Sequence, residues 1–283
     1  MIINFFRYYL NLATTKTKYE TYRPKKFLGQ NFLTDENLAK KIVNSLEITS
    51  GDTVVEIGPG KGVLTKYLEP LTDDFFAVEL DRHIVEELKQ KYRDRINLIH
   101  KDFLKVSIED DIISRRKNKG RIKIIGNIPY NITTEIIFRM TEKRNLISSA
   151  VLMMQKEVAR RLTSSPGTKD YGILAVLIQL YSVPKILFNV PPEAFFPKPR
   201  VVSSVVRFDF PENIHNEIDY GLLCEVVKKS FGKRRKTMRN SLKEFFIEKE
   251  IHQDKIEFDF NRRPESLSVE EFVNLTREIA KQI

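Results

Sequence analysis

The sequence has little cysteine, little histidine and no long hydrophobic run. Cys224 is the single cysteine among 283 residues, which excludes a disulfide framework and a cysteine-based zinc site. One cysteine also fits a reducing compartment, so we predict a cytoplasmic protein. The four histidines have no metal-ligand spacing, and no metal is expected. No apolar run approaches the roughly 18 residues of a membrane-spanning helix, and no membrane association is expected.

Acidic residues are in the minority, and the basic residues are clustered. The chain has 48 lysines and arginines against 38 aspartates and glutamates, which gives a net charge of +10 and a pI of about 9.4. The basic residues concentrate at positions 7–26, 115–123 and 228–239. One such cluster is often an ordinary solvated face. Three clusters in one chain favour a polyanionic partner, and we predict nucleic acid.

Composition divides the chain into three parts. Residues 1–22 resemble a weak organelle-targeting segment, but they lack its arginine density and cleavage site, and we interpret them as a basic arm. Residues 23–210 are predicted to form a catalytic domain. Residues 211–283, where the pattern turns helical after Pro211, are predicted to form a small α-helical domain.

Apolar runs alternate with helical patterns through the catalytic domain. Strands are predicted at residues 54–57, 75–78, 96–99, 122–125 and 150–154, and helices at residues 64–71, 84–92 and 134–140. This order predicts an α/β fold with a parallel, doubly wound, Rossmann-like sheet and helices on both faces. Two strands at residues 183–190 and 201–210, joined by a proline-rich loop, predict an antiparallel addition at the sheet edge. The last helices are expected at residues 220–230, 236–246 and 269–280.

A glycine-rich turn follows the first strand of the predicted sheet. Gly58 and Gly60 allow a tight turn and let a ligand approach the backbone. Glu79 ends the second strand, 21 positions beyond Gly58, where a carboxylate can accept hydrogen bonds from ribose hydroxyls. Asp102 follows the third strand, where a carboxylate can accept from an adenine amine. These residues predict a nucleoside cofactor at the carboxyl ends of the strands.

Two cofactors compete for this site, a dinucleotide and S-adenosylmethionine. A dinucleotide site needs the spacing Gly-x-Gly-x-x-Gly, whereas the third glycine here is Gly62 and gives Gly-x-Gly-x-Gly. Glu56, just before the turn, would repel a phosphate but suits a sulfonium or ammonium group. We therefore favour S-adenosylmethionine.

A second motif, Asn127-Ile128-Pro129-Tyr130, follows the fourth strand. The Asn127 side-chain oxygen can accept one hydrogen of a planar amine, and a backbone carbonyl near Ile128 or Pro129 can accept the other. Pro129 stiffens the turn, and Tyr130 can stack on a base. With the cofactor turn upstream, this motif predicts methyl transfer to the exocyclic amine of adenine.

Six segments resemble the KsgA/Dim1 family of rRNA adenine dimethyltransferases. They are residues 26–33 (KFLGQNFL), 56–60 (EIGPG), 126–130 (GNIPY), 155–159 (QKEVA), 196–199 (FPKP) and 231–242 (FGKRRKTMRNSL). The resemblance runs from about Arg23 to the C-terminus and is greatest to the bacterial branch. It implies a class I methyltransferase fold and S-adenosylmethionine-dependent dimethylation of two adjacent adenosines, each on N6, near the 3′ end of small-subunit rRNA. The implied partner is this rRNA within a pre-ribosomal particle, and the protein is expected to be a monomer.

The resemblance also assigns site residues. The implied cofactor contacts are Asn31, Leu33, Gly58, Glu79, Asp102 and Asn127, to which the glycine turn adds Gly60. The implied catalytic residues are Asn127, Pro129 and Tyr130. The aromatic-proline loop offers Phe195 or Phe196 to close over the other face of the base. The basic segment is expected to contact RNA phosphates through Lys233, Arg234, Arg235 and Lys236.

Two alternatives stay open. The Erm enzymes, which methylate large-subunit rRNA, share residues 30–33 and 127–130, but they usually have threonine in place of Pro59 and lack the segment around Arg234. The second alternative is a non-catalytic assembly or transcription factor on the same fold. The intact Asn127, Pro129 and Tyr130 argue against lost activity.

Overall fold

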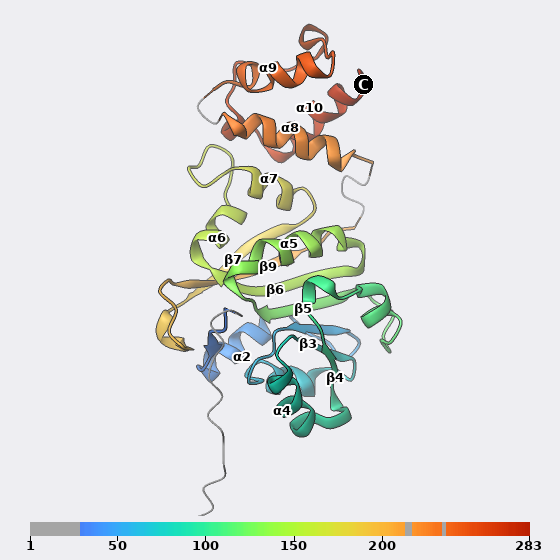
Figure 1. Ribbon diagram of the computed structural model, residues 1–283, viewed down its shortest axis with the longest axis vertical. Helices are drawn as coiled ribbons and strands as arrows, with labels where there is room; N and C mark the ends of the chain where they lie inside the picture. Colours follow the sequence, from blue (N-terminus) through green and yellow to red (C-terminus); the bar gives the residue numbers. More distant parts are fainter. Residues whose placement is uncertain (1–28, 213–216, 234–235) are drawn as a thin grey trace, which may run out of the picture.

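The computed structural model describes residues 29–212, 217–233 and 236–283, and its centre is a seven-stranded sheet (Figure 1). The strand order is β4-β3-β2-β5-β6-β9-β7. The bounds are β2 (Val54–Ile57), β3 (Phe75–Glu79), β4 (Asn97–His100), β5 (Ile122–Asn127), β6 (Ile147–Gln155), β7 (Val183–Val190) and β9 (Ser203–Asp209). The five strands β4, β3, β2, β5 and β6 run parallel to one another. Strands β9 and β7 extend the sheet beyond β6 and are antiparallel to their neighbours. The predicted α/β fold with an antiparallel edge is confirmed.

Alternation along each central strand places side chains on both faces of the sheet. In β2 and β3, Val55 and Phe76 belong to one apolar cluster, and Val54 and Phe75 to the opposite one. Because both faces are covered, these strands carry continuous apolar runs. One face is covered by α2 (Glu36–Asn44), α3 (Thr65–Leu68) and α4 (Arg82–Tyr92), and the other by a π-helical turn at Ile108–Ile113, α5 (Thr133–Glu142) and α6 (Lys156–Leu162).

Several elements differ from the sequence prediction. The helix expected at residues 64–71 is α3 followed by a 3-10 turn at Glu69–Leu71, since Pro70 has no N–H to continue an α-helix. The sequence analysis did not predict α2, α6 or α7 (Ile173–Gln179). A small second sheet pairs β1 (Phe32–Leu33) with β8 (Phe195–Phe196), which joins the start of the described chain to the proline-rich loop.

The C-terminal helices form a layer of their own beyond α7 (Figure 1). They are α8 (Tyr220–Gly232), α9 (Met238–Glu248) and α10 (Val269–Ala280). Their apolar side chains share one cluster with α7, from which Val176 and Leu177 are buried against this layer. This apolar cluster therefore contains residues from both sides of the boundary predicted near Pro211. Within the described residues, no helix is long and apolar enough to cross a membrane.

Candidate active site

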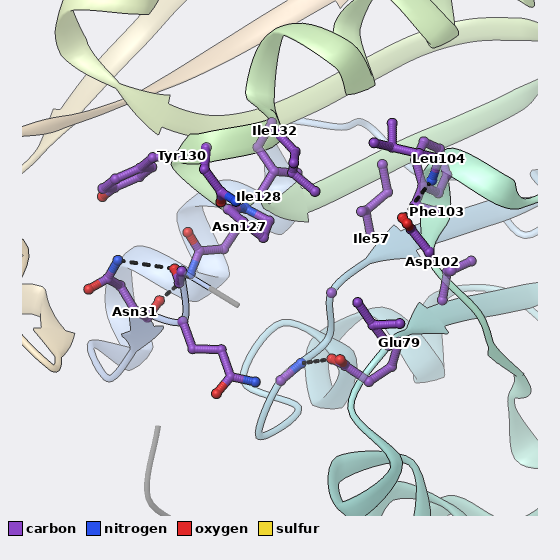
Figure 2. Close-up of a pocket in the computed structure, with 18 of the residues that line it drawn as sticks. Asn31, Ile57, Glu79, Asp102, Phe103, Leu104, Asn127, Ile128, Tyr130 and Ile132 are labelled. Atoms are coloured by element: carbon purple, nitrogen blue, oxygen red, sulfur yellow. Dashed lines mark hydrogen bonds between the residues drawn. The ribbon is translucent and has the colours of Figure 1, made fainter. Parts of the chain in front are cut away.

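A cavity of about 270 Å³ opens at the carboxyl ends of the parallel strands (Figure 2). Parallel pairing sets Ile57 of β2 level with Val78 of β3 and with Gly126 of β5. The segments that follow these strands therefore meet at one edge of the sheet. They line the cavity with Gly58, Gly60, Glu79, Leu80, Asp102, Phe103, Leu104, Asn127, Ile128 and Tyr130.

The glycine-rich turn forms one wall of this cavity. Gly58 and Gly60 have φ angles of 64° and 52°, in the left-handed region that favours glycine. A Cβ atom on Gly60 would lie 2.8 Å from the Phe32 ring, so the turn and the β1 segment can pack this closely only with glycine here. Since Gly58 and Gly60 both line the cavity, the backbone of the turn borders whatever occupies it.

The Glu79 carboxylate is held in place by backbone N–H groups. Its oxygens accept hydrogen bonds from the Gly60 N–H at 3.2 Å and the Asp81 N–H at 2.8 Å. The side chain is largely buried, and burial raises the pKa of Glu79, while these N–H groups act in the opposite direction. A carboxylate fixed in this way at a cavity wall is suited to accept hydroxyl donors from a ligand.

Asp102 lies on the same side of the cavity as Glu79, beside apolar side chains and opposite Asn127 and Tyr130 (Figure 2). Its Oδ1 accepts a hydrogen bond from the Leu104 N–H at 3.0 Å, so Asp102 caps the N-terminus of the 3-10 turn Phe103–Lys105. Ile57, Phe103 and Leu104 line the same part of the cavity. This combination of flat apolar walls and one carboxylate suits a planar ring that carries an amine.

The Asn127 side chain has one defined orientation. Its Nδ2 donates a hydrogen bond to the Asn31 carbonyl at 2.7 Å. This bond leaves Oδ1 of the same amide to accept a hydrogen bond from another group. Of the two backbone carbonyls considered for the second acceptor, that of Pro129 already accepts from the Thr133 hydroxyl and the Ile132 N–H. Within the described part of the chain, no hydrogen bond reaches the Ile128 carbonyl. The structure therefore offers Asn127 Oδ1 and Ile128 O as a pair of acceptors.

Tyr130 lines the cavity next to Asn127 (Figure 2). Its hydroxyl forms a hydrogen bond of 2.6 Å with the Ser203 hydroxyl, and burial raises the pKa of Tyr130. Sequence reasoning did not find Ser203, because serine after a loop is common and only the fold brings β9 behind the tyrosine. It also missed Gln30, Phe32 and Lys101, which line the cavity.

Three of the residues predicted to contact the cofactor or the base lie outside the lining of this cavity. Leu33 is buried and lines a smaller neighbouring hollow beyond the glycine turn. Phe195 is only 4% exposed and packs in the core, so it is not free to close over a ligand. Phe196 is 61% exposed, which leaves it as the aromatic side chain of this loop that is open to a partner.

Glu56, interpreted from the sequence as suited to a sulfonium or ammonium group, is buried beside the glycine turn and lies outside the lining of the main cavity. Glu56 is 1% exposed, lines the smaller hollow and accepts a hydrogen bond of 2.7 Å from the Thr65 hydroxyl. Burial raises its pKa to about 8, against the effect of the Thr65 hydrogen bond and with a contribution from the Glu79 charge. At neutral pH Glu56 is therefore mainly a neutral carboxylic acid.

Substituting Glu56 with glutamine is expected to stabilise the protein at alkaline pH. A folded-state pKa of about 8, above the ordinary 4.5, means that the folded protein keeps a proton that the unfolded chain loses. The free energy of unfolding of the parent protein should therefore fall as the pH rises from 4.5 to about 8, by up to about 1.4 kcal/mol per pH unit. Glutamine keeps the acceptor for Thr65 and has no proton to lose. Urea unfolding at about pH 5 and about pH 9 measures the difference, and Glu86→Gln on the exposed face of α4 is the control. Parallel pH profiles for Glu56→Gln and the parent would contradict the assignment.

The basic clusters differ in how they are used. In the cluster at residues 115–123, Lys123 pairs with Asp52 at 2.9 Å, and Arg121 donates to the carbonyls of Arg144 and Phe210. These two side chains therefore make contacts within the fold. In the C-terminal cluster, Lys233 pairs with Glu244 at 2.9 Å and Lys236 is exposed. Arg234, Arg235 and the predicted arm at residues 1–22 lie outside the described residues.

Known proteins resemble this chain over nearly its whole length. Residues 22–281 match the family described as ribosomal RNA adenine dimethylase. The chain is 41% identical to ribosomal RNA small subunit methyltransferase A of Alkaliphilus metalliredigens, over 95% of this chain and 96% of the relative. It is 43% identical to the protein of that name from Chlorobium phaeobacteroides, over 90% and 93%.

Solved structures share the fold. A dimethyladenosine transferase from Plasmodium falciparum superposes with a TM-score of 0.74 at 24% identity, over 89% of this chain and 98% of that one. The 23S rRNA methyltransferase ErmE superposes with a TM-score of 0.66 at 22% identity, over 88% and 100%. Both structures are less than 25% identical to this chain and show the fold alone, so the family assignment rests on sequence. By the match over residues 22–281 and the identity to its relatives, the chain belongs to the ribosomal RNA adenine dimethylase family.

Proposed function

We propose that the protein dimethylates N6 of two adjacent adenosines near the 3′ end of small-subunit rRNA, with S-adenosylmethionine as methyl donor. The observation that carries the proposal is the pair of acceptors, Asn127 Oδ1 and Ile128 O, at the edge of a cavity whose other wall holds two carboxylates. The acceptors suit the two hydrogens of an adenine amine. The carboxylates suit the ribose and the adenine of a cofactor.

The cavity fits this cofactor at both ends. Glu79, fixed by two backbone N–H groups, would hold the ribose hydroxyls, and Asp102 beside Phe103 and Leu104 would hold the adenine. The methionine part would lie along the glycine turn, towards Asn31, which lines the same cavity. When bound, S-adenosylmethionine supplies an electrophilic methyl group. Leu33 is proposed to contribute only through the smaller hollow beside the turn.

The chain's own residues prepare the amine. The lone pair of the adenine N6 is delocalised into the ring, which makes the nitrogen a weak nucleophile. Asn127 and the Ile128 carbonyl, by accepting the two N–H hydrogens, favour a tetrahedral nitrogen and free its lone pair. Pro129 keeps these acceptors in one turn, and Tyr130 provides a face for the base. After methylation the nitrogen is acidic enough to lose its proton to water, so no strong base is required.

The RNA assignment follows the relatives, which are named for the small ribosomal subunit. Exposed cations on α8, on α9 and in the segment between them support it, since Lys228, Lys236 and Arg239 are suited to phosphate contacts. The basic segment with Lys233, Arg234 and Arg235 is proposed to extend this contact. Exposed Phe196 is proposed to contact the RNA near the cavity. We further propose that the protein acts in the cytoplasm as a monomer on a pre-ribosomal particle.

Methyl transfer to isolated ribosomal subunits tests this function. The protein is incubated with labelled S-adenosylmethionine and small subunits that lack the modification, and the RNA is digested to nucleosides. Label in N6,N6-dimethyladenosine is the expected result. Label only with large subunits would indicate an Erm-type enzyme. No label with either subunit, from a protein that binds the cofactor, would favour a non-catalytic assembly factor.

Removing the Glu79 carboxylate should weaken cofactor binding. Glu79→Ala is expected to lower the affinity for S-adenosylmethionine by roughly 1–3 kcal/mol, because a hydrogen-bond acceptor for the ribose is lost. Glu79→Gln keeps one acceptor oxygen and should lose less. Isothermal titration calorimetry measures both, and Glu86→Ala, on the exposed side of α4, is the matched control. Unchanged affinity in Glu79→Ala would remove this residue from the site.

A further inference from the structure

The two ends of the Asn127–Tyr130 turn are each anchored by a different segment. At one end, Asn127 Nδ2 donates to the carbonyl of Asn31, just before β1. At the other end, the Tyr130 hydroxyl pairs with the hydroxyl of Ser203, the first residue of β9, at 2.6 Å. The proposed function uses Asn127 and Tyr130, but it gives no role to Ser203.

Ser203 is fixed more firmly than a loop residue would be. Its exposure is 0%, and strand pairing places it between Gln155 of β6 and Val190 of β7. The preceding residue, Val202, accepts a hydrogen bond from the Lys156 N–H at 3.0 Å. A hydroxyl on this site has little freedom to move. It can therefore define the position of a phenol that lines a more open cavity.

The anchors of the turn are also linked to each other. Strand β1 pairs with β8, with Phe32 opposite Phe196 and Leu33 opposite Phe195. The Thr34 N–H and hydroxyl both reach the Ala194 carbonyl, at 2.8 and 3.0 Å. The chain then runs from β8 through the proline-rich loop to Ser203. One unit, made of β1, β8 and the start of β9, thus contacts both the Asn127 side chain and the Tyr130 ring.

We propose that Ser203 is a positioning residue for methyl transfer, which fixes the Tyr130 ring against the target adenine through the hydroxyl–hydroxyl contact. The inference rests on the proposed function and adds a residue to it. A tyrosine ring can still stack without its hydroxyl, but it can tilt and slide. A base held on a loose ring presents its amine less often in line with the methyl donor, and small misplacements are costly in such reactions. The contact should therefore affect the rate of the chemical step more than the affinity for RNA.

A double-mutant cycle on the two hydroxyls tests the role. Ser203→Ala and Tyr130→Phe should each lower the single-turnover rate of methyl transfer by about 5–10-fold, the equivalent of one hydrogen bond. The double variant should be no slower than either single variant, because both remove the same contact. Affinities for RNA and S-adenosylmethionine should stay at parent values. The matched control is Ser204→Ala, since Ser204 is equally buried on the same strand but donates to Asn189 at 2.8 Å, outside the site.

A spectroscopic measurement separates this inference from the proposed function. The protein contains ten tyrosines, and ring-labelled samples of Tyr130→Phe identify the NMR signal of Tyr130 by its loss. This signal should shift in Ser203→Ala and stay in place in Ser204→Ala. An unshifted signal, or parent rates in Ser203→Ala, would overturn the role of Ser203. A parent protein that methylates no RNA would overturn the proposed function, and the NMR shift would then decide the anchor alone.

Discussion

Asn127→Ala is expected to reduce the single-turnover rate of methyl transfer by about 10²–10³-fold, the usual effect of removing one preorganised polar group from the reacting centre. The substitution removes the acceptor Oδ1, and it also removes the Nδ2 donor that now fixes the Asn31 carbonyl at 2.7 Å. The first and second methylations should be slowed together, because N6-methyladenosine keeps one amine hydrogen for the same acceptors. Counting monomethyl and dimethyl products over time measures both steps.

Binding measurements control for damage to the site. RNA affinity should change little in Asn127→Ala, since phosphate contacts on the C-terminal helices are expected to dominate it. Cofactor affinity can fall modestly through the β1 segment, which packs against the glycine turn by the contact of Phe32 with Gly60. A variant that keeps the parent rate in both methylations would reject the two-acceptor mechanism. A variant that loses RNA binding as well would show that the residue acts on binding, not on the chemical step.

The sequence predicts the ligand end of the sheet well, for a physical reason. Buried parallel strands need continuous apolar runs, and polar residues at their ends then mark one edge. Gly58, Glu79, Asp102 and Asn127 could therefore be placed together before the structure, and they do line one cavity. The antiparallel edge was also predictable, because the proline-rich loop separates two β-rich runs.

Contacts between distant segments could not be predicted from the sequence. The Asn31 carbonyl and the Ser203 hydroxyl reach the turn at 127–130 only through sheet pairing, and neither residue has a local signal for this contact. The surroundings of Glu56 could not be predicted for a related reason, since the sequence shows a carboxylate beside the turn but not the burial that raises its pKa. The alternation that buries Phe195 and exposes Phe196 needs the register of β8 against β1.

Helix α7 illustrates the same limit at the level of the core. Its run of apolar residues, Ile173–Gln179, looks like a buried strand or a buried helix when only the sequence is considered. It packs on α5, α6 and β7 on one side and on α8 and α10 on the other, and the last two lie more than forty positions further along the chain. The C-terminal helical layer thus shares one apolar core with α7.

Gly126→Ala should have the second large effect, on both stability and rate. Gly126 lies opposite Ile57 in the pairing of β5 with β2, and a Cβ atom at this position would be 2.6 Å from the Ile57 carbonyl oxygen. Because the obstructing atom is backbone, the strands must separate, which should cost about 1–3 kcal/mol of unfolding free energy. The strain falls between the glycine turn after β2 and Asn127, the residue that follows Gly126. Displacement of Asn127 by even part of an ångström should lower the rate of methyl transfer by up to about 10²-fold.

Urea unfolding and single-turnover methylation of the same sample test both effects. Gly51→Ala, in the turn before β2, is the matched control, because a Cβ atom there meets no atom within 4 Å. The control should keep the parent rate and stability. If Gly126→Ala lost stability but kept its rate, the strands would have adjusted away from the site, and the acceptor pair would tolerate such shifts. If both rate and stability were unchanged, the close approach of β2 and β5 at Ile57 would be wrong, and with it the geometry that places Asn127 beside the glycine turn.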